Sequence, residues 1–352
     1  MNIKVAEDQV LACVRHGLYL VRDGEQRLAI LLRGPSDMHP TPQIHIDIMA
    51  TERTSAERFL AELRASIRKR NIYRGHILSL SVNPYGAIQI DFHKLPKIAR
   101  ENIILPAGLL ERIERQTVRF AQHSQKLLAT GRHLKRGILL HGLPGTGKTL
   151  TAMYLAGQMR DRTVLLLTGR GLGLIERSCA MARVLQPSIV ILEDVDLVAE
   201  ERTRPGAACT ALLFELLNEM DGLADDADVL FLLTTNRPDI LEPALASRPG
   251  RIDQAIEVPL PDTSCRRRIF EFYARGLTLR LRELESFVER TEGVSAAFIR
   301  ELIRKAALFA ADEGGEIAIE DRHLEEALHE LVVDGGELTK SILGVQPAPP
   351  RV

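Results

Sequence analysis

Four short aliphatic runs dominate the middle of the chain. Each is nearly continuous in Val, Ile and Leu, and together they cover 137–140, 163–167, 188–192 and 229–234. Strands that are buried on both faces of a parallel sheet have this pattern, whereas strands with one solvated face alternate apolar and polar residues. Longer segments with helical periodicity separate the runs, so the pattern predicts an α/β fold with a doubly wound parallel sheet.

The first hundred residues follow a different pattern. Segments on either side of Asp23-Gly24 read as a hairpin, because Asp-Gly is a strong turn signal. The stretch 44–48 alternates Ile with polar residues, as in a half-buried strand. Thr54 and Glu57 have the spacing of a capping box ahead of a helix, and a second hairpin is predicted over 76–92. Residues 1–100 are therefore predicted to form an α+β N-terminal domain.

The chain after Pro261 reads as helical. Helices are predicted over 265–277, 282–291, 295–313 and 319–333. The predicted organisation is an N-terminal domain over 1–100, a large α/β subdomain over 101–262, a helical subdomain over 263–334 and a disordered tail over 335–352.

Composition excludes several classes of protein. Hydrophobic residues make up 45% of the 352 residues and charged residues 26%, the balance of a globular protein with sizeable cores. The net charge of −1 argues against a dedicated nucleic-acid binder, which needs clustered Lys and Arg. The first hundred residues carry more basic than acidic side chains, and this pattern favours a solvated surface over a polyanion site.

The cysteines and the N-terminus indicate the compartment. Cys13, Cys179, Cys209 and Cys265 form no CxxC pair, which predicts neither a zinc site nor a disulfide framework. The first residues are polar and lack the apolar region of a signal peptide, and no stretch approaches the ~20 apolar residues of a membrane span. Isolated histidines in the N-terminal strands show no metal-ligand spacing. We therefore expect a cytoplasmic protein.

The motif GLPGTGKT follows the first aliphatic run and precedes a helix-forming segment, the context that a phosphate-binding loop requires. Its glycines let successive backbone N–H groups point at phosphate oxygens, and the helix N-terminus adds its positive end. Lys148 is predicted to reach the β- and γ-phosphates, and Thr149 to ligate Mg²⁺. The predicted nucleotide-binding residues are Gly142, Leu143, Pro144, Gly145, Thr146, Gly147, Lys148, Thr149 and Leu150.

Polar side chains also follow two other aliphatic runs. Glu193 and Asp194 come directly after 188–192, and Asn236 follows 229–234. Parallel α/β sheets bind ligands at the carboxyl ends of their strands, so we expect all three side chains near the phosphate loop. One acid is expected to hold the magnesium shell and the other to polarise the attacking water. The Asn236 amide is expected to position that water or to touch the γ-phosphate.

Two arginines stand three residues apart beside a Pro-Gly turn. Arg248 and Arg251 follow a segment that reads as a short helix leading away from the chain's own phosphate loop. Guanidinium groups placed in this way can act as arginine fingers on the nucleotide of the next subunit. Where an enzyme needs such a finger, it raises the rate of hydrolysis ~10³–10⁵-fold. The alternative is a local salt bridge, for instance between Arg251 and Asp253.

Together these motifs resemble the AAA clade of the AAA+ ATPases from Lys135 to about Val333. The matching stretches are RGILLHGLPGTGKT, LEDVD, FELLNEMDGL and TTNRPDILEPALASRPGRID, and ENIILPAGLLERIE resembles the lead-in segment that lies against the adenine. The resemblance implies ATP and Mg²⁺ as cofactors. It also implies a ring, usually a hexamer, in which Arg248 and Arg251 face the neighbour's γ-phosphate and which acts most often on a protein client.

The chain departs from the clade at several positions. Its acidic pair is ordered Glu193-Asp194, as in Bcs-type members, where most of the clade has Asp then Glu. By position Glu193 is assigned to magnesium and Asp194 to the water, and the reverse stays open. Segment 169–177 is short and has no aromatic residue, which weakens substrate threading, although Leu172, Leu174 and Ile175 are candidates to grip a substrate.

Three further departures concern the lid and the partners. Residues 292–298, EGVSAAF, are similar to the clade's small-residue contact to the base, without a clear sensor arginine. No HExxH zinc motif is present, which excludes the metalloprotease relatives as functional equivalents. The penultimate Tyr with which proteasomal ATPases dock is also absent, so a protease partner has no support.

The predicted fold is a P-loop ATPase core with a C-terminal helical lid and an α+β N-terminal domain. The leading function is an ATP-driven, ring-forming protein remodeller or chaperone-like assembly factor that acts on a protein client. The alternative is a nucleotide-gated scaffold or regulatory switch with slow hydrolysis. Nucleic-acid remodelling is a third reading, suggested only by the mildly basic N-terminal region.

Overall fold

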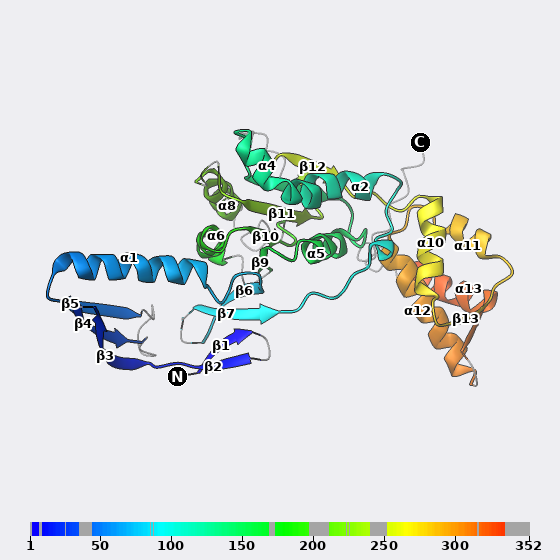
Figure 1. The fold of residues 1–352 in the computed structure, drawn as a ribbon. Helices are drawn as coiled ribbons and strands as arrows, with labels where there is room; N and C mark the ends of the chain where they lie inside the picture. The colour runs from blue at the N-terminus through cyan, green and yellow to red at the C-terminus, as the bar shows by residue number, and fades with distance from the viewer. Residues whose placement is uncertain are drawn as a thin grey trace.

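The computed structural model describes residues 2–6, 9–24, 26–34, 44–84, 86, 88–168, 173–196, 211–222, 224, 226–239, 252–314 and 317–334. In this part of the chain no helix is long and apolar enough to cross a membrane. The lid helices lie at one end of the molecule and the N-terminal strands at the other, with the large sheet between them (Figure 1).

A seven-stranded sheet forms the centre of the molecule. Its strand order is β12-β8-β11-β10-β9-β6-β7, and every pairing from β12 to β6 is parallel. The strands are β6 Ile77–Val82, β7 Ile88–His93, β8 Arg136–His141, β9 Thr163–Leu167, β10 Ser188–Leu192, β11 Val229–Thr235 and β12 Gln254–Glu257. The four aliphatic runs correspond to β8, β9, β10 and β11, which confirms the predicted doubly wound core.

Side chains of the central strands alternate between two buried layers. Val190 and Phe231 pack in a layer with α6 and α8, whereas Ile191 and Leu232 pack in a layer with α2 and α5 on the opposite face (Figure 1). The helices are α2 Leu109–Glu114, α5 Lys148–Gln158, α6 Ile175–Val184 and α8 Ala211–Asp221. Because both faces are covered, all residues of β10 and β11 are buried.

The hairpin β6–β7 belongs to this central sheet. β6 pairs in parallel with β9 at Ile77, Leu78 and Ser79, and β7 then pairs antiparallel with β6 as the edge strand. The sheet therefore runs across the predicted boundary at residue 100, since part of the first hundred residues extends the core. The hairpin itself lies where the sequence predicted it.

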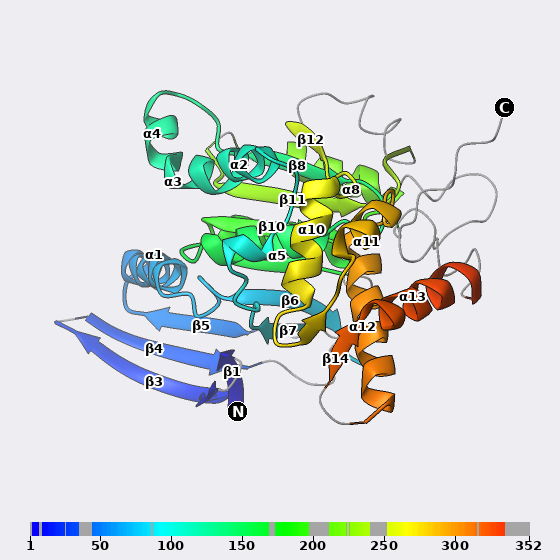
Figure 2. The ribbon, with the colours of Figure 1, turned by 90° about the vertical axis from the view of Figure 1, so that its right-hand side faces the viewer.

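The rest of the N-terminal region forms two smaller sheets. The strands are β1 Asn2–Ala6, β2 Gln9–Ala12, β3 His16–Asp23, β4 Gln26–Arg33 and β5 His45–Ala50, with β1–β2 in one antiparallel sheet and β3–β4–β5 in the other. α1, Arg53–Lys69, covers one face of the three-stranded sheet (Figures 1 and 2). The predicted hairpin at Asp23-Gly24 and the strand after residue 43 are confirmed.

The predicted capping box ahead of α1 is wrong. The helix begins at Arg53, its N-cap residue is Glu52, and no side chain caps it. Glu57 instead accepts a hydrogen bond of 2.7 Å from Arg53 Nε, because the pair is spaced i, i+4 on one helix face. The carboxylate that a capping box needs is thus engaged elsewhere.

Short helices connect β7 to β8. They are the 3₁₀ turn η1 Arg100–Asn102, α2, the π-turn η2 Arg115–Arg119, α3 Phe120–Gln122 and α4 Ser124–Ala129. Residues 103–105 lie between η1 and α2 and form part of the boundary between the core and the lid.

The C-terminal region is a helical lid, as predicted, with one addition. Its elements are α10 Thr263–Tyr273, β13 Thr278–Arg280, α11 Leu284–Arg290, α12 Ala296–Asp312, β14 Ala318–Glu320, α13 Asp321–His329 and the π-turn η4 Glu330–Asp334. β13 and β14 form a short parallel pair, and β14 takes the first residues of the helix predicted over 319–333. The helix predicted over 265–277 ends earlier, at Tyr273. Ile319 of β14 is fully buried in the lid core, where a strand residue and a helix residue are equally apolar.

Candidate functional site

The glycine-rich loop joins β8 to α5 through backbone conformations that favour glycine. Gly142, Gly145 and Gly147 have φ values of 146°, 74° and 96°. A Cβ atom on Gly142 would lie 2.3 Å from the carbonyl oxygen of Val258, so the backbone there leaves no room for a side chain. Gly147 is the N-cap of α5, and the first amides of that helix have no intrahelical acceptor. The loop is therefore built to present N–H groups to an anion.

Lys148 lies beneath this loop. It is only 5% exposed, and its Nζ donates hydrogen bonds to the carbonyl oxygens of Gly142 at 2.9 Å and Leu143 at 2.8 Å. Burial lowers the pKa of Lys148 to about 8, against the opposing effect of the Asp194 and Asp196 carboxylates. A bound polyanion would favour the charged ammonium, so this side chain suits a phosphate ligand.

Asp194 takes a strained conformation at the tip of β10. It is the one non-glycine residue of the described chain with a positive φ, at 47°. Its N–H donates to Thr234 Oγ1 at 3.0 Å, and the next N–H, of Val195, donates to the Thr234 carbonyl at 2.9 Å. Left-handed backbone at such a residue costs of order 1–3 kcal/mol and persists where neighbours hold it. β11 thus holds the strained turn that carries Asp194.

Asn236 links the two strand tips. Its Nδ2 donates to Asp194 Oδ1 at 3.2 Å, and its backbone N–H donates to Asp196 Oδ1 at 3.1 Å. Asp196 is only 4% exposed and also accepts a hydrogen bond of 2.8 Å from Thr235 Oγ1. Burial, and then the Asp196 carboxylate, raise the pKa of Asp194, while Lys148 and the Asn236 amide act in the opposite direction. The geometry gives Asp196 a positioning role that the sequence motif alone did not assign.

Glu193 occupies a different environment from its neighbour. Its N–H donates to the Leu167 carbonyl at 3.2 Å, and its Oε1 is buried with no hydrogen-bond partner in the described part of the chain. Burial, with the Asp194 carboxylate, raises the pKa of Glu193. An unpartnered buried carboxylate oxygen is costly, and a cation with its water shell would satisfy it.

A cavity of about 400 Å³ opens between the core and the lid. Lys148, Thr149, Asp194 and Asn236 all line it, whereas Glu193 does not. The other lining residues are 102–105, Pro144, Gly145, Thr146, Gly147, Leu150, Thr151, Ile269, Phe272, Tyr273, Ala296, Ala297 and Arg300. Most of the polar groups lie at the phosphate loop and the strand tips. Most of the apolar ones come from the lead-in and the lid, which also bring Asn102 and Arg300. This division suits a ligand with a charged end and an aromatic end.

The lid contacts the loop directly. The Ala297 N–H donates to the Gly145 carbonyl at 3.2 Å, and a Cβ atom on Gly145 would lie 2.6 Å from Ser295 Oγ. Ser295 is the N-cap of α12 and accepts a hydrogen bond from the Phe298 N–H. The expected small-residue contact over 292–298 therefore touches the loop backbone. Arg300, one turn into α12, brings a cation to the cavity that the sequence analysis did not assign.

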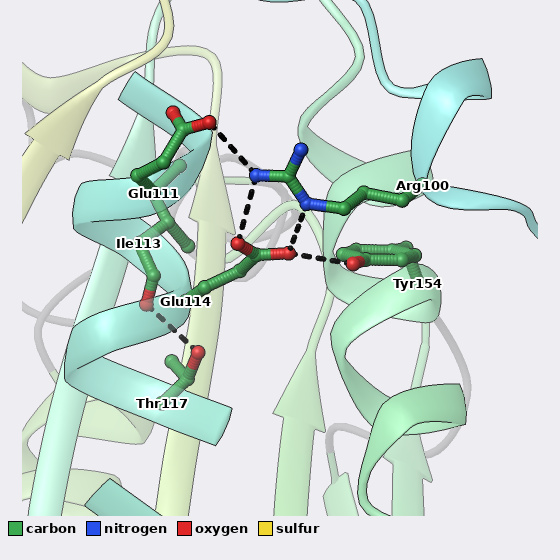
Figure 3. Close-up of polar contacts among 6 residues, drawn as sticks. All are labelled: Arg100, Glu111, Ile113, Glu114, Thr117 and Tyr154. Atoms are coloured by element: carbon green, nitrogen blue, oxygen red, sulfur yellow. Dashed lines mark hydrogen bonds and ion pairs between the residues drawn. The ribbon is translucent and has the colours of Figure 1, made fainter. Parts of the chain in front are cut away.

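A polar network holds the lead-in segment against the core (Figure 3). Arg100 Nη2 donates to Glu111 at 2.8 Å and to Glu114 Oε2 at 3.0 Å, and Tyr154 of α5 donates to Glu114 Oε1 at 2.6 Å. Burial raises the pKa of Glu114, but the hydrogen bonds from Arg100 and Tyr154 outweigh it and hold that pKa below its ordinary value. The network anchors the helix that begins at Lys148 to the segment that brings residues 102–105 to the cavity.

Several predicted residues have other outcomes. Arg248 and Arg251 lie outside the described residues, so their action on a neighbouring subunit stays a prediction. The same holds for Leu172. Ile175 cannot grip a substrate as predicted, because it is the first residue of α6 and its side chain is 1% exposed in the core. Among the described residues no cluster of His, Cys, Asp and Glu could hold a metal by itself, and His93 instead bonds Ser79.

Two family models match the chain. One describes the ATPase family associated with various cellular activities (AAA) and covers residues 138–260, and the other describes the AAA+ lid domain and covers residues 283–326. The first covers the phosphate loop and the strand tips, and the second covers α12, one of the two lid helices that line the cavity.

Curated relatives match the same region. An ATP-dependent zinc metalloprotease FtsH of Rhodococcus erythropolis is 35% identical over 238 residues, which is 63% of this chain and 27% of the relative. A proteasome-activating nucleotidase of Methanothermobacter thermautotrophicus is 28% identical over 328 residues, 82% of this chain and 79% of the relative. One from Pyrococcus horikoshii is 34% identical over 204 residues, 54% and 51%. The chain thus spans less than a third of the Rhodococcus protein.

Proposed function

Since the chain belongs to the AAA family of ATPases, we propose that it hydrolyses ATP within a ring, a hexamer on family grounds, and uses the energy to remodel a protein client. The observation that carries this proposal is the cavity in which a buried lysine, a strained carboxylate and an amide meet under a glycine-rich loop. The cytoplasm stays the expected compartment, a prediction from the spacing of the cysteines in the sequence.

The residues that line the cavity divide the work of binding. The loop amides of residues 142–150 and the Lys148 ammonium hold the phosphates, and residues 102–105 with Tyr273 enclose the base. Thr149 and Glu193 are the proposed magnesium ligands, because one offers a hydroxyl at the cavity and the other a buried carboxylate oxygen that lacks a partner. Magnesium, when bound, neutralises charge on the phosphate oxygens.

Asp194 and Asn236 are the proposed groups that act on the attacking water. Asp194 accepts the water proton as the bond between the water oxygen and the γ-phosphorus forms and the bond to the bridging oxygen of ADP breaks. The raised pKa of Asp194 makes this carboxylate a better proton acceptor than an ordinary aspartate. Asn236 Nδ2 fixes the orientation of the Asp194 carboxylate through the 3.2 Å hydrogen bond to Oδ1. Asp196 in turn holds Asn236 by accepting a hydrogen bond from its backbone N–H. The products are ADP and phosphate.

A slow nucleotide switch is the second candidate, and one observation favours it. Glu193 does not line the cavity that Asp194 and Lys148 line. If magnesium binding depends on a recessed carboxylate, ATP hydrolysis would be slow. The ATP-bound state would then hold a partner for longer than the ATP-bound state of a remodeller does. The two candidates differ in whether a protein client accelerates hydrolysis.

Mixing two inactive variants tests the ring. Arg248→Ala should bind ATP but fail to activate the neighbouring subunit, and Lys148→Ala should fail to bind ATP. A mixed assembly contains interfaces where an intact phosphate loop faces an intact Arg248, so we expect the mixture to regain part of the turnover that neither variant has alone. Phosphate release is measured at fixed total protein, with Arg251→Ala examined in the same way.

The matched control is Arg64→Ala, a change at an exposed arginine of α1 outside the ATPase core. This variant should keep full turnover. Normal hydrolysis by Arg248→Ala, or constant turnover per subunit down to a proven monomer, would contradict a finger that acts between subunits.

A further inference from the structure

The sheet β3–β4–β5 has one covered face and one open face. Leu28 and Ile30 point to the side of α1 and are only 5% and 9% exposed. On the other side the cross-strand partners are Leu18 with Leu31, Leu20 with Ala29, and Ala29 with Met49. We define the open face as Leu18, Leu20, Arg22, Arg27, Ala29, Leu31, Arg33, Asp47 and Met49, in which the one carboxylate, of Asp47, is paired with Arg33.

The apolar side chains of the open face are strongly exposed. Leu18 is 65% exposed, Leu20 81% and Met49 75%. The first two lie on β3 and the third on β5, and Ala29 and Leu31 of β4 lie between them on the same face. Single exposed apolar residues are ordinary, but a contiguous group of this kind marks an interaction surface. The surface also has a hollow of about 450 Å³, lined in part by Leu20 and Met49.

The charge of this hollow indicates what it binds. Arg22 and Arg27 stand directly opposite each other on β3 and β4, next to the Leu20 and Ala29 pair. Like charges at opposed positions destabilise a sheet. No acidic residue lines the hollow, and no carboxylate among the described residues forms an ion pair with either arginine. Arg22 Nε donates to the Gly24 carbonyl at 3.0 Å, and the other N–H groups of the two guanidinium groups are suited to carboxylates of a partner.

The backbone of the sheet offers a further contact. In the part of the chain that the structure describes, β3 pairs only with β4, and no strand pairs with its outer edge. An edge of eight residues can accept an extended peptide through main-chain hydrogen bonds, with specificity from alternate side chains. A peptide added there would place every second side chain beside Leu18, Leu20 and Arg22.

We propose that the open face binds an extended, acidic segment of a protein client, which adds to the edge of β3. Its apolar side chains lie beside Leu18 and Leu20, and its carboxylates lie next to Arg22, with Arg27 beyond it on β4. The identification of the occupant as a client rests on the proposed remodelling function, whereas the binding itself does not require ATP turnover.

A labelled peptide as long as β3 tests this site on the full-length protein without nucleotide. The peptide alternates Val and Thr and carries two Glu residues at one end, and a second peptide has Lys in their place. Fluorescence anisotropy should detect the Glu peptide and not the Lys peptide. The double change Arg22→Glu and Arg27→Glu should weaken binding of the Glu peptide roughly tenfold and make the Lys peptide the better ligand. That exchange of preference would not arise from unfolding.

Two further measurements sharpen the test. Leu20→Ala should weaken the Glu peptide several-fold through lost apolar contact, whereas Leu308→Ala, at a 53% exposed leucine of α12, should not. Lys148→Ala should keep peptide binding while it loses turnover, so a failure of the ATPase proposal is distinguishable from a failure of this one. Equal binding of both peptides overturns the proposal. A lower assembly mass for Leu20→Ala also overturns it, because the face would then join copies of the chain.

Discussion

β10, a continuous aliphatic run, and β3, in which aliphatic and polar residues are mixed, have opposite surroundings. Every residue of β10 is buried, and helices cover both faces of its sheet. In the described part of the chain, β3 is an edge strand whose Leu18 and Leu20 are mostly exposed, and α1 covers one face of its sheet. Burial on both sides holds the tip of β10 rigidly enough to keep Asp194 in a strained conformation. One open side leaves β3 available to a partner.

The comparison teaches where each kind of chemistry can reside. Catalysis needs groups held in a fixed geometry, and the fully buried strands β10 and β11 provide this through Thr234, Asp196 and Asn236. Recognition of an extended segment needs accessible backbone and apolar surface, which the central sheet lacks along β8 to β10. The two sheets therefore suit two different tasks in one chain.

The largest expected effect falls in the central sheet. Lys148→Ala should abolish ATP binding and turnover, because this side chain is the buried cation beneath the loop. Binding is measured by calorimetry and turnover by phosphate release. Lys126→Ala, an exposed lysine of α4, is the control and should match the unchanged protein. Retained ATP binding by Lys148→Ala would remove the assignment of the loop.

The unchanged protein gives an independent check on the same side chain. Because the pKa of Lys148 is lowered to about 8, the ammonium is lost as the pH rises through that value in the absence of ligand. ATP binding should therefore weaken above pH of about 8 and take up a proton there, which calorimetry in buffers of different ionisation enthalpy detects.

The next effect compares the stability of the two sheets. Phe231→Ala should lower the free energy of unfolding by about 3–5 kcal/mol, because its ring is fully buried between β11 and the helices α6 and α8. Met49→Ala should change it by less than about 0.5 kcal/mol, since that side chain is mostly exposed. Chemical denaturation followed by circular dichroism measures both. Equal shifts would mean that another part of the protein covers the open face.

A smaller effect separates the two acids at the tip of β10. Asp194→Asn should keep ATP bound but slow hydrolysis by roughly 10²-fold or more, because an amide can hold water but cannot accept its proton. Glu193→Gln should instead raise the magnesium concentration needed for half-maximal turnover. Turnover is titrated with Mg²⁺ for both variants. If added Mg²⁺ rescues Asp194→Asn and not Glu193→Gln, the two roles are reversed.

Much of the site could be predicted because its residues follow strands whose burial is visible in the sequence. Residues buried on both faces must be aliphatic, so β8, β9, β10 and β11 appear as continuous runs, and the polar residue after each run marks a strand tip. The sequence predicts Asp194 and Asn236 in this way and Lys148 from the glycine-rich loop motif, and the structure brings all three to one cavity.

Contacts between distant segments could not be predicted in the same way. The pairing of β6 with β9, the approach of Ser295 to Gly145 and the place of Arg300 depend on how separate elements pack. The exposure of Leu18 and Leu20 is a similar case, because alternation predicts a half-buried strand without saying which face a helix will cover.

The sequence by itself thus determined the phosphate loop, the order of its polar partners and the existence of a buried parallel sheet, since each depends on residues adjacent in the chain. Tertiary structure alone decided that Asp194 and not Glu193 lines the cavity, because only the hydrogen bonds from β11 fix that turn. It also decided that Arg22 opposes Arg27, because register between strands is set by long-range packing as well as by the turn.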